Sequence, residues 1–282
     1  MLGKILAARE QSAEPIMHPL ISILCVVPIF GGSWILRRRK LWKHLEAHLA
    51  ASDYSEAKRA KSSVRNPTNA WTALSYWYAG LYTLEVTLFR QRERPLNCAG
   101  NLPHWHIAIG VALLWVGAST FLFHASLSER WRWLSSGAAM GTASLPVVFT
   151  GFRSLQKLDD EPRFMLIALG AFAGCHVIAW RSGYVSTVLR LNLTFTLAVE
   201  WSTMRKIQTE DAKVAWVLAV GLLLLGWTMH ACDVYKRKLP GRSLATHAAW
   251  LGHPAWHVLS AVGVALLVSG GRAVEEKWCT KR

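Results

Sequence analysis

The chain has 282 residues, 52% of them hydrophobic, and its 32 Lys and Arg against 17 acidic residues give a formal net charge of +15. With a mean hydropathy of +0.22 and apolar runs of bilayer-crossing length, this composition excludes an ordinary soluble domain and favours a membrane protein. The basic residues lie in short stretches between the apolar runs and form no nucleic-acid-binding module. We therefore expect anionic lipid headgroups, and no nucleic acid, as their partners. The five Cys residues include no close pair, so neither a zinc ribbon nor a disulfide framework is predicted.

Residues 1–66 are predicted to form an N-terminal extension. An apolar run over about 16–36 is long enough for a transmembrane helix and too long for the core of a signal peptide. The segment 37–65 that follows is rich in Lys and Arg. We expect it to form a basic amphipathic helix on the membrane surface.

Seven further apolar segments follow, and each is close to the roughly 20 residues that a membrane-crossing helix needs. They cover 67–89, 105–127, 131–152, 162–180, 185–204, 212–232 and 246–270. The sequence therefore predicts an all-α, polytopic membrane bundle with seven core transmembrane helices over 67–272 and one extra N-terminal transmembrane helix. Residues 273–282 are expected to form a polar tail.

The last core segment opens with His253 and His257, which lie four residues apart and so share one face of a helix. Two imidazoles at this spacing are a common way for a helix to bind a divalent metal. Histidine is costly in hydrocarbon, so a pair here needs a partner, which is either a metal or neighbouring helices. Pro254 between them fits only in the first turn of the helix or at a kink.

A third histidine, His124, lies near the end of the second core segment. Because consecutive helices cross in alternate directions, the end of the second and the start of the seventh fall in the same leaflet. Thr120 lies four residues before His124 on the same face, where its hydroxyl can orient a ligand, donate to an oxyanion or bond to its own backbone. Three histidines and an open fourth position are typical of a catalytic zinc site.

Three motifs carry a family resemblance: residues 117–127 around His124, the His-x-x-Trp-His sequence of 253–257, and residues 66–72 leading into Gly80. Together they resemble the alkaline ceramidase family, within the CREST superfamily of seven-helix membrane hydrolases, over about residues 66–268. The resemblance implies an endomembrane (ER or Golgi) enzyme that hydrolyses the amide of ceramide to sphingosine and a fatty acid. It also implies that Zn²⁺ is held by the three histidines and that Thr120 stands where the family has a serine.

The chain departs from the family at the catalytic base. An aspartate early in the third core helix holds and deprotonates the attacking water in that family, whereas Ser135 or Ser136 stands there in this chain. Serine cannot act as that base, and loss of a general base typically lowers the rate by about 10²–10⁴. Glu129 and Asp233 fall on the same side of the membrane as the histidines, where each either substitutes for the base or lies in solvent. Asn66 stands where the family usually has a glutamate.

Two functions follow from these residues. The first is zinc-dependent hydrolysis of the amide of ceramide or a related N-acyl lipid, impaired by the missing aspartate, with Thr120 and Ser135 as catalytic-site residues. The second is a catalytically degenerate subunit of a larger membrane complex, for which the mitochondrial inner membrane is an alternative location because a strongly basic chain suits anionic membranes. A lipid-binding receptor, also found in the superfamily, is a third reading that no residue singles out.

Overall fold

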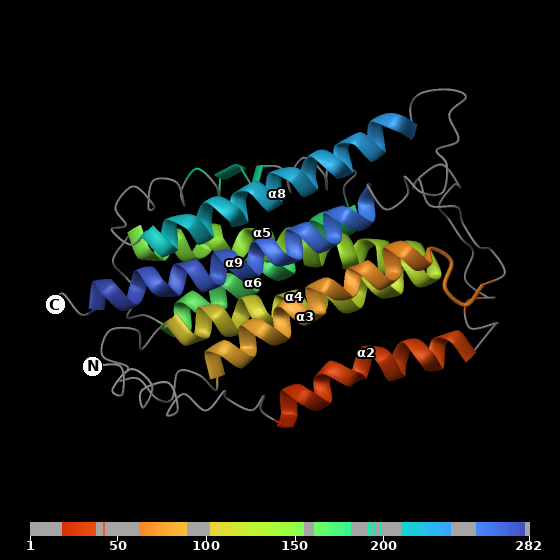
Figure 1. The fold of residues 1–282 in the computed structure, drawn as a ribbon, viewed down its shortest axis with the longest axis horizontal. Coiled ribbons are helices and arrows are strands. Elements are labelled where there is room, and N and C mark those ends of the chain that lie inside the picture. The colour runs from red at the N-terminus through yellow and green to blue at the C-terminus, as the bar shows by residue number, and fades with distance from the viewer. Residues whose placement is uncertain are drawn as a thin grey trace, which may run out of the picture.

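The computed structural model describes residues 19–37, 42, 62–88, 102–154, 161–181, 191–192, 194–195, 198, 210–237 and 252–279. Within these ranges the chain forms seven helices and no strand, so the all-α prediction is confirmed. They are α2 (Pro19–Arg37), α3 (Pro67–Leu88), α4 (Leu102–Ser126), α5 (Glu129–Ser154), α6 (Glu161–Arg181), α8 (Glu210–Arg237) and α9 (His253–Cys279). Figure 1 shows them lying side by side along the length of the molecule.

The observed helices match most of the predicted segments. The segments predicted at 67–89, 105–127, 131–152, 162–180 and 212–232 correspond to α3, α4, α5, α6 and α8, and the N-terminal run to α2. Helix α9 begins at His253 and continues through Cys279, into the expected polar tail. The segment predicted at 185–204 and most of the basic segment 37–65 lie outside the described residues. The count of seven core helices plus one therefore stays a prediction.

The join between α4 and α5 reverses the chain within two residues. Leu127 has a φ of 53°, the left-handed conformation that commonly ends a helix, and its N–H donates to the carbonyl of Phe123 at 2.6 Å. This conformation disfavours leucine, but the side chain is buried with Phe123 and packs against Trp131. The hydrophobic contact that usually accompanies such a cap thus holds α4 and α5 antiparallel.

Helix α3 is central to the packing. It contacts both α4 and α9; α8 packs on the outer side of α9, α5 joins α4 to α6, and α2 lies against α3 (Figure 1). At the α3–α4 contact, a Cβ on Gly80 would lie 2.7 Å from the backbone oxygen of Gly110. Only glycine allows this approach, a form of packing that is common between membrane helices.

Two helical stretches are long and apolar enough to cross a membrane, Trp105–Ser126 of α4 and Lys213–Cys232 of α8. The first is 61% buried inside the bundle, whereas the second is only 22% buried. The outward-facing side chains of α6 and α8 are large and apolar; they include Leu166, Leu169, Val177, Val214, Val217 and Leu224. This surface is consistent with a membrane protein, while the full multi-pass topology stays a prediction.

Candidate metal centre

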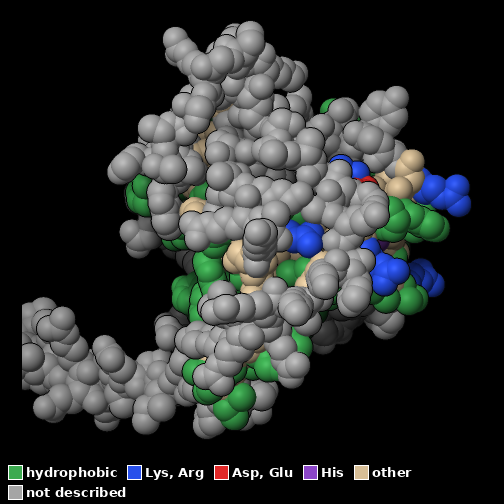
Figure 2. Space-filling model, turned by 90° about the vertical axis from the view of Figure 1, so that its right-hand side faces the viewer, with side chains coloured by type: hydrophobic (Ala, Val, Ile, Leu, Met, Phe, Trp, Pro, Cys, Tyr) green, Lys and Arg blue, Asp and Glu red, His purple; other side chains and the backbone are tan. Residues whose placement is uncertain are grey.

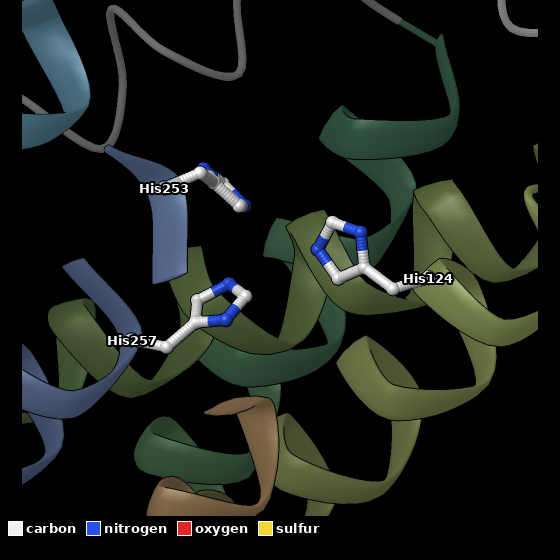
Figure 3. Close-up of side chains that lie close together, drawn as sticks. All are labelled: His124, His253 and His257. Carbon is white, nitrogen blue, oxygen red and sulfur yellow. The ribbon is translucent and has the colours of Figure 1, made fainter. Parts of the chain in front are cut away.

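The three predicted histidines come together in the structure. His124 lies in the last turn of α4, and His253 and His257 occupy the first two turns of α9. One ligand nitrogen from each lies within 4.8 Å of the others, and Figure 3 shows the rings arranged around a common space. The side chains of His124 and His257 are buried and that of His253 is half-buried. The prediction that two distant segments place these residues in one site is confirmed.

The spacing of the nitrogens fits one metal ion. Two ligands of a tetrahedral zinc, each about 2.1 Å from the ion, lie about 3.4 Å apart. Since the three nitrogens already lie within 4.8 Å of one another, small side-chain rotations bring them to that separation. Neutral imidazoles suit zinc and also copper, iron or nickel, so the donor set supports a transition metal without selecting one.

Pro254 occupies the first turn of α9, which is one of the two positions expected for it. The first hydrogen bond of this helix runs from the N–H of Trp256 to the carbonyl of Gly252 at 3.2 Å. A proline at this point loses no helical hydrogen bond and presets the backbone for the helix. The site therefore needs no kink between His253 and His257.

The chain before α3 is tied to the end of α4 that carries His124. The N–H groups of Arg65 and Asn66 donate to the carbonyls of Ala125 and His124, both at 3.0 Å. The guanidinium of Arg65 donates to the Ser126 carbonyl at 2.7 Å, at the helix end where a cation is favoured. Burial lowers the pKa of Arg65 from its ordinary value. These bonds fix the backbone position of His124 relative to α3.

Two residues that the sequence analysis did not single out bond to the α9 histidines. The hydroxyl of Thr72 on α3 lies 3.2 Å from Nδ1 of His257. On α8, Nδ1 of His230 lies 3.0 Å from Nδ1 of His253. The alternation of membrane crossings also places the end of the sixth core segment in the leaflet of the site. The topology therefore indicated that His230 lies at the same depth as the three histidines. For Thr72 there was no indication beyond its membership of the 66–72 motif.

The two predicted catalytic-site residues meet each other. Thr120 is buried on α4, and its Oγ1 lies 2.8 Å from Oγ of Ser135 on α5. The aligned alternative, Ser136, is the next residue on the same helix, whereas the contact to Thr120 is made by Ser135. Of the two serines, the structure thus brings Ser135 to Thr120.

No carboxylate among the described residues joins the histidine cluster. Glu129 accepts hydrogen bonds from Arg132 and, at 2.8 Å, from Nε1 of Trp133, so it is occupied within the first turn of α5. The side chain of Asp233 lies outside the described residues. Asn66, where the ceramidase resemblance expects a glutamate, is buried and its Oδ1 has no hydrogen-bond partner among the described residues.

Comparisons of the chain with family models, with curated proteins and with solved structures find no match. The ceramidase resemblance therefore depends on the sequence motifs around the three histidines. What the structure adds is that these motifs meet at one point.

Proposed function

We propose that the protein is a multi-pass membrane hydrolase that binds zinc at His124, His253 and His257 and cleaves the amide bond of ceramide or a related N-acyl lipid. The observation that carries this proposal is the convergence of one imidazole from α4 and two from α9. Zinc in such a site polarises a carbonyl and lowers the pKa of a water at the open position.

Thr120 and Ser135 suit the stabilisation of negative charge. Two hydroxyls 2.8 Å apart share one hydrogen between them and leave the second free to donate elsewhere. A donor aimed at the oxygen of a tetrahedral intermediate typically contributes about 10²–10³ in rate. Neither hydroxyl can replace the aspartate base, so we expect hydrolysis about 10²–10⁴ slower than with a carboxylate.

The end of the bundle that holds the site also suits a membrane interface. Arg130 and Arg132 are exposed at the start of α5, and Arg181 is exposed at the end of α6. The guanidinium of Arg181 lies 5.2 Å from the ring centroid of Trp180, which is exposed. Figure 2 shows Lys and Arg side chains beside hydrophobic ones on this end. Tryptophan and arginine are typical of the headgroup level, where they meet anionic lipids.

One observation favours the second function, a catalytically degenerate subunit of a larger membrane complex. Ser135, at the position of the missing base, bonds to Thr120 in a contact that needs no water and no substrate. A protein with this arrangement can keep the fold and bind the metal without catalysing hydrolysis. The endomembrane system suits the hydrolase and the mitochondrial inner membrane suits the subunit.

The deciding experiment uses the full chain purified in mild detergent. Bound zinc is measured, and fatty-acid release is followed from a labelled ceramide, with His257→Ala as the control for contaminating activity. Slow release that disappears in the control supports the hydrolase. Full zinc occupancy with release at the level of the control, together with migration in a much larger complex on a native gel, supports the subunit. Absence of zinc rejects the metal centre in both.

A further inference from the structure

We propose that His230 is a positioning residue for the metal centre: it accepts a hydrogen bond from Nδ1 of His253 and so fixes Nε2 of His253 as the ligand atom. The inference rests on the proposed metal site and extends it to α8. It assigns His230 a role that the three-histidine set alone does not include.

The geometry engages Nδ1 of His253 and leaves its Nε2 as the nitrogen that can bind a metal. Its Nδ1 lies 3.0 Å from Nδ1 of His230, a hydrogen-bond distance that requires one proton between the two nitrogens. With that proton on His253, its Nε2 carries a lone pair, and the proton of His230 moves to its own Nε2. Figure 3 shows a nitrogen at the outer end of the His253 ring facing the space shared with His124 and His257.

His230 itself lies outside the ligand set. It does not belong to the group whose nitrogens all lie within 4.8 Å of one another, and its Nδ1 is already engaged with His253. Its ring is held by two aromatic contacts, with centroids 6.0 Å from both Trp227 and Trp256. The imidazole is therefore oriented by packing before any metal binds.

The second α9 histidine is held in the same way from the opposite side. The Thr72 hydroxyl has backbone carbonyls to donate to, Thr68 at 2.8 Å and Asn69 at 3.2 Å, so its oxygen is available to accept from Nδ1 of His257 at 3.2 Å. Both α9 histidines thus present Nε2, one oriented from α8 and the other from α3. Partners of this kind usually change metal affinity by about 10–100-fold.

The test compares two variants of the full chain in detergent. His230→Phe keeps an aromatic ring between the tryptophans but removes the acceptor, and His230→Asn places an amide oxygen where Nδ1 was. Zinc affinity is measured by competition with a chelator, and the absorption spectrum of the Co²⁺-loaded protein reports the ligand geometry. We expect about 10–100-fold weaker zinc binding and an altered Co²⁺ spectrum for the Phe variant. The Asn variant should restore both.

The same zinc-affinity comparison tests the partner of His257. It uses Thr72→Val, which is isosteric but has no acceptor, and Thr72→Ser, which keeps the hydroxyl. Equal zinc affinity in His230→Phe and the unmodified protein overturns the proposal, as does equal loss in the Phe and Asn variants. Loss of one imidazole from the metal's ligand count in His230→Phe, measured by X-ray absorption, also overturns it because His230 would then be a ligand. Absence of zinc from the unmodified chain rejects the metal centre itself. Zinc binding that does not depend on His230 rejects only the positioning role of His230, so the two failures are distinguishable.

Discussion

Replacing His124 by Ala tests whether α4 and α9 are joined through a metal. The substitution removes the only nitrogen of the cluster that α4 supplies and leaves the α9 pair in place. The matched control is His106→Ala, because His106 is also a buried histidine on α4. It lies 18 residues earlier, about 27 Å along the helix at about 1.5 Å per residue. Both variants lose a buried imidazole from the same helix, but only one loses a ligand.

The expected loss of zinc affinity follows from the removal of one of three proposed ligands. Loss of an outer hydrogen-bond partner costs about 10–100-fold in metal affinity, so loss of a direct ligand should cost at least about 100-fold. With free zinc at about 100 times the Kd of the unmodified protein, zinc stabilises the folded state by about 2.7 kcal/mol. After a 100-fold loss of affinity, the same zinc concentration gives only about 0.4 kcal/mol. The zinc-dependent part of the stability should therefore fall by about 2.3 kcal/mol.

The measurement is thermal unfolding of the full chain in detergent, with and without zinc, together with zinc content after purification. His106→Ala should keep the zinc-dependent shift in the unfolding temperature even if its overall stability is lower. His124→Ala should lose the shift. A His124 variant that keeps both its zinc and its shift, or a His106 variant that loses them equally, refutes the three-histidine centre.

Three further predictions concern the base, the packing and the protonation of the ligands. Ser135→Asp should raise ceramide hydrolysis by about 10²–10⁴ if the base alone is missing, and an unchanged rate in the zinc-loaded variant argues against that position. Gly80→Ala, whose Cβ would lie 2.7 Å from the Gly110 oxygen, should destabilise the protein by about 1–3 kcal/mol in thermal unfolding, whereas Gly174→Ala, with nothing within 4 Å of its Cβ, should not. Zinc bound by neutral imidazoles should be released on acidification, because protons compete for the same nitrogens. Dialysis over a pH series followed by metal analysis measures this release. Zinc retention that improves as the pH falls contradicts histidine ligation.

The sequence predicted the helices and the histidine cluster because both depend on simple regularities. Apolar runs of bilayer length became α3, α4, α5, α6 and α8. Predicting that His124 and the α9 pair share a site required only that the chain cross the membrane an even number of times between them. A prediction of this kind needs no knowledge of which helices touch.

The partners of the site could not be predicted in the same way, because they depend on how the helices rotate against one another. The contact between His230 and His253 follows from the packing of α8 on α9, and that between Thr72 and His257 from the packing of α3 on α9. The hydrophobic pattern of a nearly all-apolar helix does not specify its rotation, since most of its faces look alike. The sequence therefore predicted that the three histidines meet, but not that His230 and Thr72 are their hydrogen-bond partners.

In the proposed function, metal binding and catalysis depend on different helices and are therefore separable. The proposed ligands come from α4 and α9, whereas Ser135, where the ceramidase resemblance expects the base, lies on α5 and contacts α4 through Thr120. In the proposed site, serine in place of aspartate on α5 removes the base without touching a proposed ligand, His230 or Thr72. Zinc occupancy alone therefore cannot distinguish a hydrolase from a degenerate subunit. The rate has to be measured on zinc-loaded protein, and Ser135 is the residue at which the two functions diverge.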